Sequence, residues 1–313
     1  MATSGTTTFS MTRNDLIRQA ALETSAIATG QIMGAQMVQD FAVKMNSMIK
    51  HWQGRGIHVW TISEATLFPV AGQVTYSAGT GATDHITREW WQTTLSAVGA
   101  AADTVLNLTS TANITASDYI GIVLDDLTVH WTTVSSKTAT TATIAAALPS
   151  AAASGSRVFN YTTKIERPVQ VVDARRYSVA NATTTPITLL STQEYRALPN
   201  RAASGSVNQM QYDRQLSLGK FHLWTVPATM SELVEFTWWR PFEVFTAASN
   251  NPDLPEEWFN TIMWNLAFEM MGRFPVAPDR RRLIAAKAES TLMDMEGFGR
   301  ENESISVQPM TAW

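Results

Sequence analysis

Apolar residues near the start of the chain recur every three or four positions, which is the period of an amphipathic helix. A first helix is predicted to begin near Thr12, whose hydroxyl can cap the turn that Asp15 helps to close. A second helix is predicted over about residues 31–52, with an apolar stripe of Met33, Met37, Phe41, Met45, Met48, Ile49 and Trp52. This stripe is typical of a buried helix face, although methionine at this density also suits an adaptable interface.

The helical period returns in the last quarter of the chain. Residues 251–258 predict a helix start, with Asp253 as the cap and Pro255 in the first turn. That helix is expected to reach about Arg273, and a last helix is expected over residues 279–296. The last helix carries on one face Leu283, Ala286, Ser290 and Met293. Once the helices pack together, we expect no long apolar stripe to remain exposed.

Between these ends the period changes to two, which is typical of strands. Strand-like runs in residues 57–82 and 162–250 predict a largely antiparallel sheet or small sandwich. Residues 83–161 differ from their neighbours in pattern and composition. Short strand candidates alternate with turns, and 19 of the 25 residues in 132–156 are Thr, Ser or Ala. This segment predicts an inserted barrel or sandwich, which requires the two ends of the host loop to lie close together.

The pattern as a whole predicts an α+β fold. It consists of a four-helix body from both chain ends, an antiparallel β region in the middle, and an inserted small all-β domain. The predicted limits are 1–56 for the N-terminal arm and helices, 57–82 with 162–250 for the β region, 83–161 for the insert, 251–299 for the C-terminal helices, and 300–313 for an extended C-terminal arm.

Composition narrows the classes of function. The 313 residues include 23 basic and 27 acidic side chains, a net charge of −4. A protein that binds DNA phosphates should carry a basic excess or stripe, so this balance suits protein contacts or a channel that DNA passes without sticking. Cysteine is absent, which excludes disulfides, thiolate zinc sites and thiol nucleophiles. With neither a signal peptide nor an apolar window of membrane length, we expect a soluble chain with no membrane partner.

The common catalytic motifs are missing from the sequence. It contains no Gly-x-Ser-x-Gly, Gly-x-x-x-x-Gly-Lys or His-Glu-x-x-His. Four of the five histidines lie within two residues of a tryptophan, which favours half-buried positions over catalytic ones. Asp125 and Asp126 are adjacent and would point to opposite faces of a strand, so we expect a turn there. The sequence therefore predicts no catalytic, metal or cofactor site.

Two further segments are candidates for binding. Arg280, Arg281 and Arg282 form the densest basic run, either a solvated helix start or an intersubunit or channel-facing group. After Gly299 the helical period stops, yet apolar residues continue. An extended strand there could lay them in a partner's groove, while a frayed end is the other interpretation. The candidate binding residues of this arm are Ile305, Val307, Pro309, Met310 and Trp313.

Eight short segments follow one another in a recognisable order. They are TRNDLI (12–17), WQGRGIHVW (52–60), PVAGQVTY (69–76), EYRALPN (194–200), RPFEVF (240–245), NPDLPEEW (251–258), WNLAFE (264–269) and EGF (296–298). Each segment alone is unspecific. The resemblance that the ordered set carries covers about three quarters of the chain. The set resembles the tail accessory factor family of short-tailed bacteriophages (podoviruses), also called packaged-DNA-stabilising or head-to-tail adaptor proteins.

The resemblance implies a structural protein of the virion neck and tail, made in the host bacterial cytoplasm. Its helical body would pack side by side in a homododecameric ring beneath the portal protein, extend the DNA channel and retain packaged DNA until ejection. The C-terminal arm would grip the portal, and a distal tail nozzle or tube protein would bind below. Residues 83–161 depart from the shortest family members, and a tail fibre is their expected partner. We expect the free chain to be monomeric and to form the ring only with portal.

A virion-associated peptidoglycan-degrading enzyme stays open as the alternative. Glycan hydrolysis needs two carboxylates roughly 5–10 Å apart, and any fold can bring distant acids together. The adaptor predicts a large ring without turnover, whereas the enzyme predicts hydrolysis of peptidoglycan.

Overall fold

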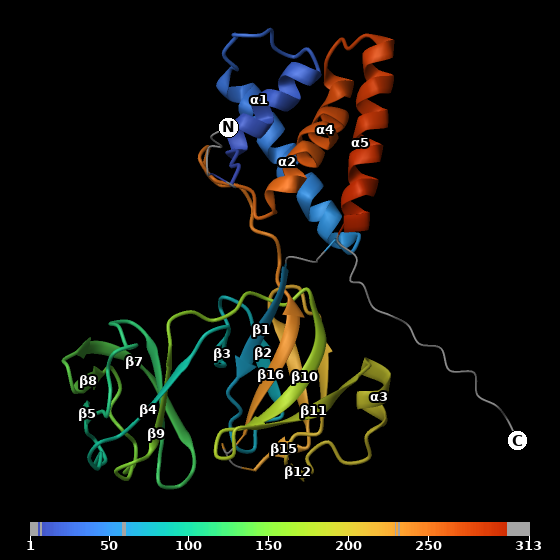
Figure 1. Cartoon of the computed structure of the whole chain (residues 1–313). Coiled ribbons are helices and arrows are strands. Elements are labelled where there is room, and N and C mark those ends of the chain that lie inside the picture. The colour runs from blue at the N-terminus through green and yellow to red at the C-terminus, as the bar shows by residue number, and fades with distance from the viewer. Residues whose placement is uncertain (1–5, 7, 58–60, 229, 231, 299–313) are drawn as a thin grey trace, which may run out of the picture. The chain divides into compact units, whose positions relative to one another are not determined.

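The computed structural model of the chain describes residues 6, 8–57, 61–228, 230 and 232–298 (Figure 1). The chain forms two compact units. Unit 1 combines Met1–Trp60 with Phe242–Trp313, and unit 2 consists of Thr61–Pro241. Segments from the two ends of the sequence therefore build one unit together.

Unit 1 is helical. Its elements are α1 (Arg13–Glu23), α2 (Ala35–Gly54), a 3-10 turn (Glu256–Trp258), α4 (Phe259–Met270), a second 3-10 turn (Met271–Arg273) and α5 (Pro278–Phe298). Helix α4 lies between α2 and α5 and packs against α1 as well (Figure 1). The largest fully buried side chains of its core are Trp258, Phe41, Leu16, Ile17 and Met45. Most of the predicted methionine stripe lies in or against this core, which confirms its interpretation as a buried face.

The predicted cap of α1 is confirmed. Thr12 Oγ1 accepts a hydrogen bond from Asp15 N at 3.3 Å, and the Asp15 carboxylate accepts one from Thr12 N at 3.0 Å. Side-chain and backbone hydrogen bonds from Thr12 lower the pKa of Asp15 because they stabilise the charged carboxylate. The third helix starts inside the predicted stretch, because the 3-10 turn at Glu256–Trp258 runs directly into α4 at Phe259. The N-cap of that turn is Pro255 rather than the predicted Asp253, whose carboxylate accepts a hydrogen bond from Glu243 N at 3.0 Å.

The face of α5 that the sequence suggested as its packing face is exposed in the structure. All four of its residues are exposed, namely Leu283, Ala286, Ser290 and Met293. The exposed fraction is 42% for Leu283 and 61% for Met293. Ile284 and Ala288 are buried and, at 3.6 residues per turn, lie on nearly the opposite face of the helix. The helix therefore has two apolar stripes on different faces, and only the one with Ile284 joins the core of unit 1.

Unit 2 contains an eight-stranded sheet in the order β2-β14-β13-β11-β10-β16-β1-β3. Its strands are β1 (Ile62–Leu67), β2 (Thr75–Ala78), β3 (Ile86–Thr87), β10 (Gln170–Ser178), β11 (Thr183–Leu190), β13 (Gln209–Asp213), β14 (Gly219–Trp224) and β16 (Glu232–Trp239). The pairing is antiparallel except between β11 and β13. Phe236 pairs with Ala65 on one side and Ala174 on the other, so the first and last strands of the unit meet in one sheet. A short helix, α3 (Thr192–Ala197), and a small ribbon of β12 (Ser204–Gly205) and β15 (Val226–Pro227) complete it.

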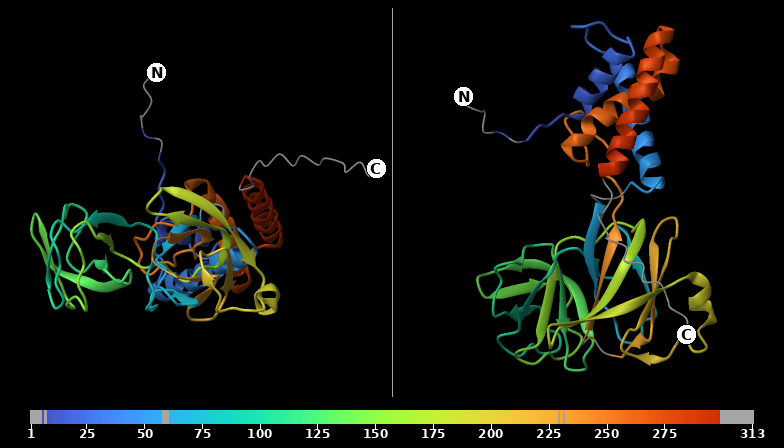
Figure 2. Two further views of the ribbon diagram at one scale, coloured as in Figure 1. Left: turned by 90° about the horizontal axis from the view of Figure 1, so that it is seen from below. Right: turned by 45° about the vertical axis from the view of Figure 1, so that its right-hand side comes forward.

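A second sheet of unit 2 is a nearly closed six-stranded barrel beside the first (Figure 2). Its strands are β4 (Trp91–Thr94), β5 (Val105–Asn107), β6 (Tyr119–Val123), β7 (Val129–Lys137), β8 (Thr141–Ile144) and β9 (Arg157–Tyr161). The order is β4-β9-β6-β7-β8-β5, and a bridge between Leu95 and Leu108 closes the ring. The chain enters on β4 and leaves on β9, which pair through Trp91 and Asn160.

An apolar cluster joins the barrel to the eight-stranded sheet. Its buried members are Phe68, Phe159, Tyr161, Met230 and Leu233. The ring of Phe68 contacts that of Trp131 edge-on at 5.1 Å between centroids. Strand β3, in residues 83–161, pairs with β1 of the larger sheet, while the strands of the barrel begin at Trp91. The limits proposed for the insert stay a prediction.

The fold class expected from the sequence is wrong. The structure is mostly β, with 16 strands in three sheets and five α-helices within the described residues, which conflicts with a four-helix body. Helices of 11 to 21 residues repeat their period several times and dominate a sequence pattern. Many of the strands have only two to five residues, which is too short for an alternation to stand out.

Candidate functional site

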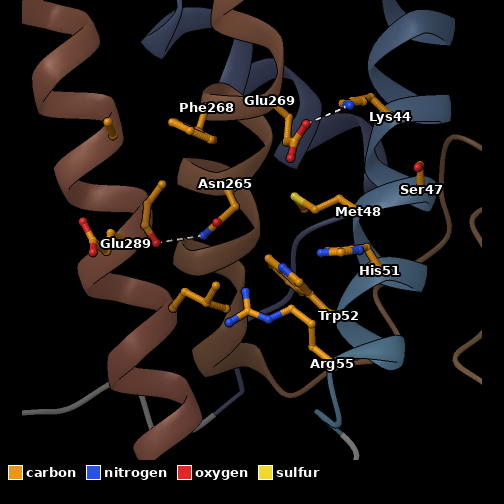
Figure 3. Close-up of a pocket in the computed structure, with 13 residues that line it drawn as sticks. Lys44, Ser47, Met48, His51, Trp52, Arg55, Asn265, Phe268, Glu269 and Glu289 are labelled. Carbon is orange, nitrogen blue, oxygen red and sulfur yellow. Dashed lines mark hydrogen bonds and ion pairs between the residues drawn. The ribbon is translucent and has the colours of Figure 1, made fainter.

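A hollow of about 670 Å³ lies in unit 1 between α2 and α5 (Figure 3). Helix α4 packs against both of these helices and forms the floor between them. Helix α2 contributes Lys44, Ser47, Met48, His51 and Trp52, and its C-cap residue Arg55 also lines the hollow. Helix α4 contributes Asn265, Phe268 and Glu269, and α5 contributes Ala285, Ala288, Glu289 and Leu292. The hollow is therefore built only from helices of unit 1.

The polar wall of the hollow follows from helical spacing. Lys44, Ser47, His51 and Arg55 are separated by three, four and four residues, so they lie on one face of α2. In Figure 3 the side chains of Lys44, His51 and Arg55 point toward α4. The neighbouring Met48 and Trp52 are buried and form the base of the same wall.

Ion pairs cross the hollow near each end. Lys44 Nζ lies 2.7 Å from Glu269 Oε2, and Arg55 Nη2 lies 3.1 Å from Glu296 Oε1. Their side chains are 34–47% exposed, and pairs of this kind contribute only about 0–1 kcal/mol to stability. Their main effect is to place charge at the two ends of the hollow.

The floor combines a fixed amide with an exposed ring. Asn265 Nδ2 donates hydrogen bonds to Thr261 O at 2.9 Å and to Ala288 O at 3.2 Å, which ties α4 to α5. The side chain of Phe268 is 41% exposed, which is unusual for a large aromatic residue. An apolar middle with charged ends suits a segment of protein with apolar and polar side chains.

Of these lining residues, Met48 and Trp52 were named from the sequence as part of the apolar stripe, and none was predicted as a member of this hollow. The available signal was the polar face of α2, opposite the core side of the methionine stripe. That signal needs α4 and α5 beside it to become a site, and the sequence does not show which helices are neighbours.

The structure separates the three arginines of the basic run. Arg280 forms an ion pair with the Glu23 carboxylate, and its Nε donates to Glu23 O at 3.2 Å. Arg281 Nε donates to Val276 O at 3.0 Å. Arg282 points to solvent, with 83% of its side chain exposed and Asp279 at 3.6 Å. Arg280 and Arg281 therefore hold the start of α5, and an intersubunit or channel-facing role stays a prediction that suits Arg282 best.

The residues predicted to bind portal through the C-terminal arm lie outside the described residues. They are Ile305, Val307, Pro309, Met310 and Trp313. Their role stays a prediction.

The acidic pair makes hydrogen bonds within a turn, and two of the histidines are packed against other side chains. Asp125 and Asp126 form a turn, as predicted, and accept hydrogen bonds from Ala153 N at 2.8 Å and Thr128 N at 2.9 Å. Burial lowers the pKa of His85 to about 3, with a further contribution from the charge of Lys164. Burial also lowers the pKa of His222, whose ring stacks on Tyr195.

Across residues 8–57, 61–228 and 232–298, no three His, Asp or Glu side chains gather as metal ligands would. In the same ranges no helix combines the length and apolarity that crossing a bilayer requires.

Neither a protein-family profile nor a curated protein matches this chain.

Proposed function

We propose that the chain is a structural virion protein of a short-tailed phage. It is a head-to-tail adaptor whose copies form a homododecameric ring beneath the portal, extend the DNA channel and retain packaged DNA. The observation that carries the proposal is that residues of the segments resembling this family make contacts that connect separate parts of the fold. Such contacts determine the shape of a subunit in an assembly.

In unit 1 these segments join the two ends of the chain. The ring of Trp52 packs against that of Trp258 at 5.6 Å between centroids. Phe245 N donates to Asn46 Oδ1 at 2.9 Å, and Asn46 Nδ2 donates to Phe245 O at 3.1 Å. Together with Asn265, these contacts fix the faces that unit 1 can offer to neighbouring molecules.

In unit 2 the segments fix turns. Val70 N donates to the Tyr76 hydroxyl at 2.9 Å, and that hydroxyl lies 3.1 Å from Gln73 O. The turn between them needs the positive φ of Gly72, which is 78°. Glu194 closes a capping box with Ser191 at the start of α3.

Two surfaces are available for partners. The hollow between α2 and α5, with Phe268 exposed on its floor, suits a segment of a neighbouring copy or of the portal. The barrel has its own core and joins the larger sheet at one cluster, which suits attachment of a tail fibre. The C-terminal arm is proposed to grip the portal, and a nozzle or tube protein is proposed to bind below.

The test is a mass measurement on the full chain with and without the portal protein of the same phage genome. Native mass spectrometry should show twelve copies on each portal ring, and a mixture without any complex would refute the adaptor. A peptidoglycan-release assay on the same preparation tests the enzymatic alternative, because an adaptor releases nothing.

A further inference from the structure

Helix α5 presents an exposed apolar seam to solvent. Leu283, Ala286, Ser290 and Met293 are separated by three, four and three residues, which is the spacing of a coiled-coil seam. At 1.5 Å per residue the seam is about 15 Å long. Two large side chains lie at its ends and two small ones in the middle, so a second helix can approach closely along it.

The charges of α5 are divided between its two halves. The first half carries Asp279 with Arg280, Arg281, Arg282 and Lys287, and the second half carries Glu289, Asp294 and Glu296 with no basic residue. Arg280 and Glu296 already pair with Glu23 and Arg55 inside unit 1. The exposed charges nearest the seam are therefore basic at one end and acidic at the other: Arg282, Lys287, Glu289 and Asp294.

We propose that this seam binds a second copy of the chain, with the two α5 helices antiparallel about a two-fold axis near Ala288. Leu283 of each copy then lies level with Met293 of the other, and Ala286 lies level with Ser290. The basic half of each helix runs along the acidic half of the other, and the two helix dipoles also oppose each other. A parallel pair would place like charges together along its whole length.

The dimer goes beyond the proposed ring. A ring needs head-to-tail contacts between different faces, whereas a two-fold contact uses the same face twice and closes on itself. The dimer and the ring are thus distinct assemblies of one chain, so an experiment that refutes one of them does not refute the other. The prediction of a monomer rested in part on the packed helices leaving no long apolar stripe exposed, and the exposed seam of α5 does not fit that premise.

Sedimentation velocity of the full chain tests the pairing. A seam of this size should give a concentration-dependent equilibrium between 34.4 kDa and twice that mass. Met293→Lys should weaken dimerisation about tenfold or more, which corresponds to about 1.4 kcal/mol, because it replaces an apolar side chain with a positive charge beside the basic half of the partner helix. Val43→Lys is the matched control, because Val43 is 60% exposed on α2 and should leave the mass profile unchanged. A chain that stays monomeric at high micromolar concentration, or a dimer indifferent to Met293→Lys, would overturn the proposal.

Orientation is tested with cysteines, since the chain has none of its own. A mixture of Ala286→Cys and Ser290→Cys chains should form disulfide-linked dimers faster than either variant alone. Equal rates would exclude the antiparallel register.

Charge reversal provides a rescue. Arg282→Glu/Lys287→Glu and Glu289→Lys/Asp294→Lys should each be monomeric, while their mixture should dimerise. If each variant dimerises as well as the parent chain, charge does not select the partner and the proposal fails.

Discussion

The imidazole of His85 lies flat on the indole of Trp131, with ring centroids 3.9 Å apart and planes at 10°. His85 Nδ1 also shares a 2.6 Å hydrogen bond with the Tyr161 hydroxyl. Lys164 lies nearby, where its ammonium donates to Ala82 O and Thr83 O and sits over the ring of Tyr119. The histidine is thus enclosed by aromatic rings and one cation, which favours its neutral form.

Acid should weaken the fold through this histidine. In the unfolded chain His85 binds a proton near pH 6.5, whereas in the fold it does so only near pH 3. The unfolded state holds more protons between these values, so the free energy of unfolding falls as the pH falls. From pH 7 to pH 5 the expected loss is about 2 kcal/mol.

Urea unfolding at the two pH values measures this loss. The His85→Gln variant should have a lower free energy of unfolding than the parent chain at pH 7. Between pH 7 and pH 5 its free energy of unfolding should fall by about 2 kcal/mol less than that of the parent chain. An unchanged pH dependence in the variant would assign the effect to other groups.

Phe68 should be essential to the junction between the barrel and the larger sheet. Its side chain is 1% exposed and contacts Trp90, Phe159 and Tyr161. Phe68→Ala should lower the free energy of unfolding by about 3–5 kcal/mol, because it leaves a cavity that packed rings cannot fill. Thermal unfolding would show the loss, and Leu216→Ala, at a side chain that is 94% exposed, is the control.

Asn46 should matter more than its neighbour on the same helix. Its amide makes two hydrogen bonds to the backbone of Phe245, so Asn46→Leu leaves a buried N–H and a C=O without their partner. The expected cost is about 2 kcal/mol. Ser47→Ala, one position along at an exposed site, should change stability by less than about 0.5 kcal/mol. Equal effects of both substitutions in chemical denaturation would contradict this account.

Phe268 tests the hollow of unit 1. Phe268→Glu places a carboxylate on the floor near Glu269 and Glu289. The added charge would repel an acidic partner segment, and an apolar segment could bind there only by burying the charge. Because the Phe268 side chain is 41% exposed, the thermal unfolding midpoint of the variant should differ little from that of the parent chain. Its assembly on portal should weaken about tenfold or more. Gel filtration with portal measures the second effect, and unchanged assembly would exclude the hollow as a docking site.

The sequence predicted local structure better than it predicted arrangement. The capping box of Thr12 and Asp15 and the turn at Asp125 were visible because each depends on residues within three positions. The outward face of α5 was not predictable, since Leu283 and Ile284 begin two equally apolar stripes and only neighbouring helices decide between them. The hollow was missed for the same reason, because Lys44 and Glu269 lie 225 residues apart and meet only in the folded unit.

The order of pairing along the chain constrains folding during synthesis. The barrel is contiguous from Trp91 to Tyr161, so it can close as soon as that stretch leaves the ribosome. The larger sheet has to wait for Glu232–Trp239, since β16 pairs with β1, and unit 1 has to wait for α4 and α5. Helices α1 and α2 are made first and are among the last to find their partners. The nascent chain therefore carries the apolar faces of α1 and α2 without their partner helices through most of translation, which is the condition in which nascent chains generally bind chaperones.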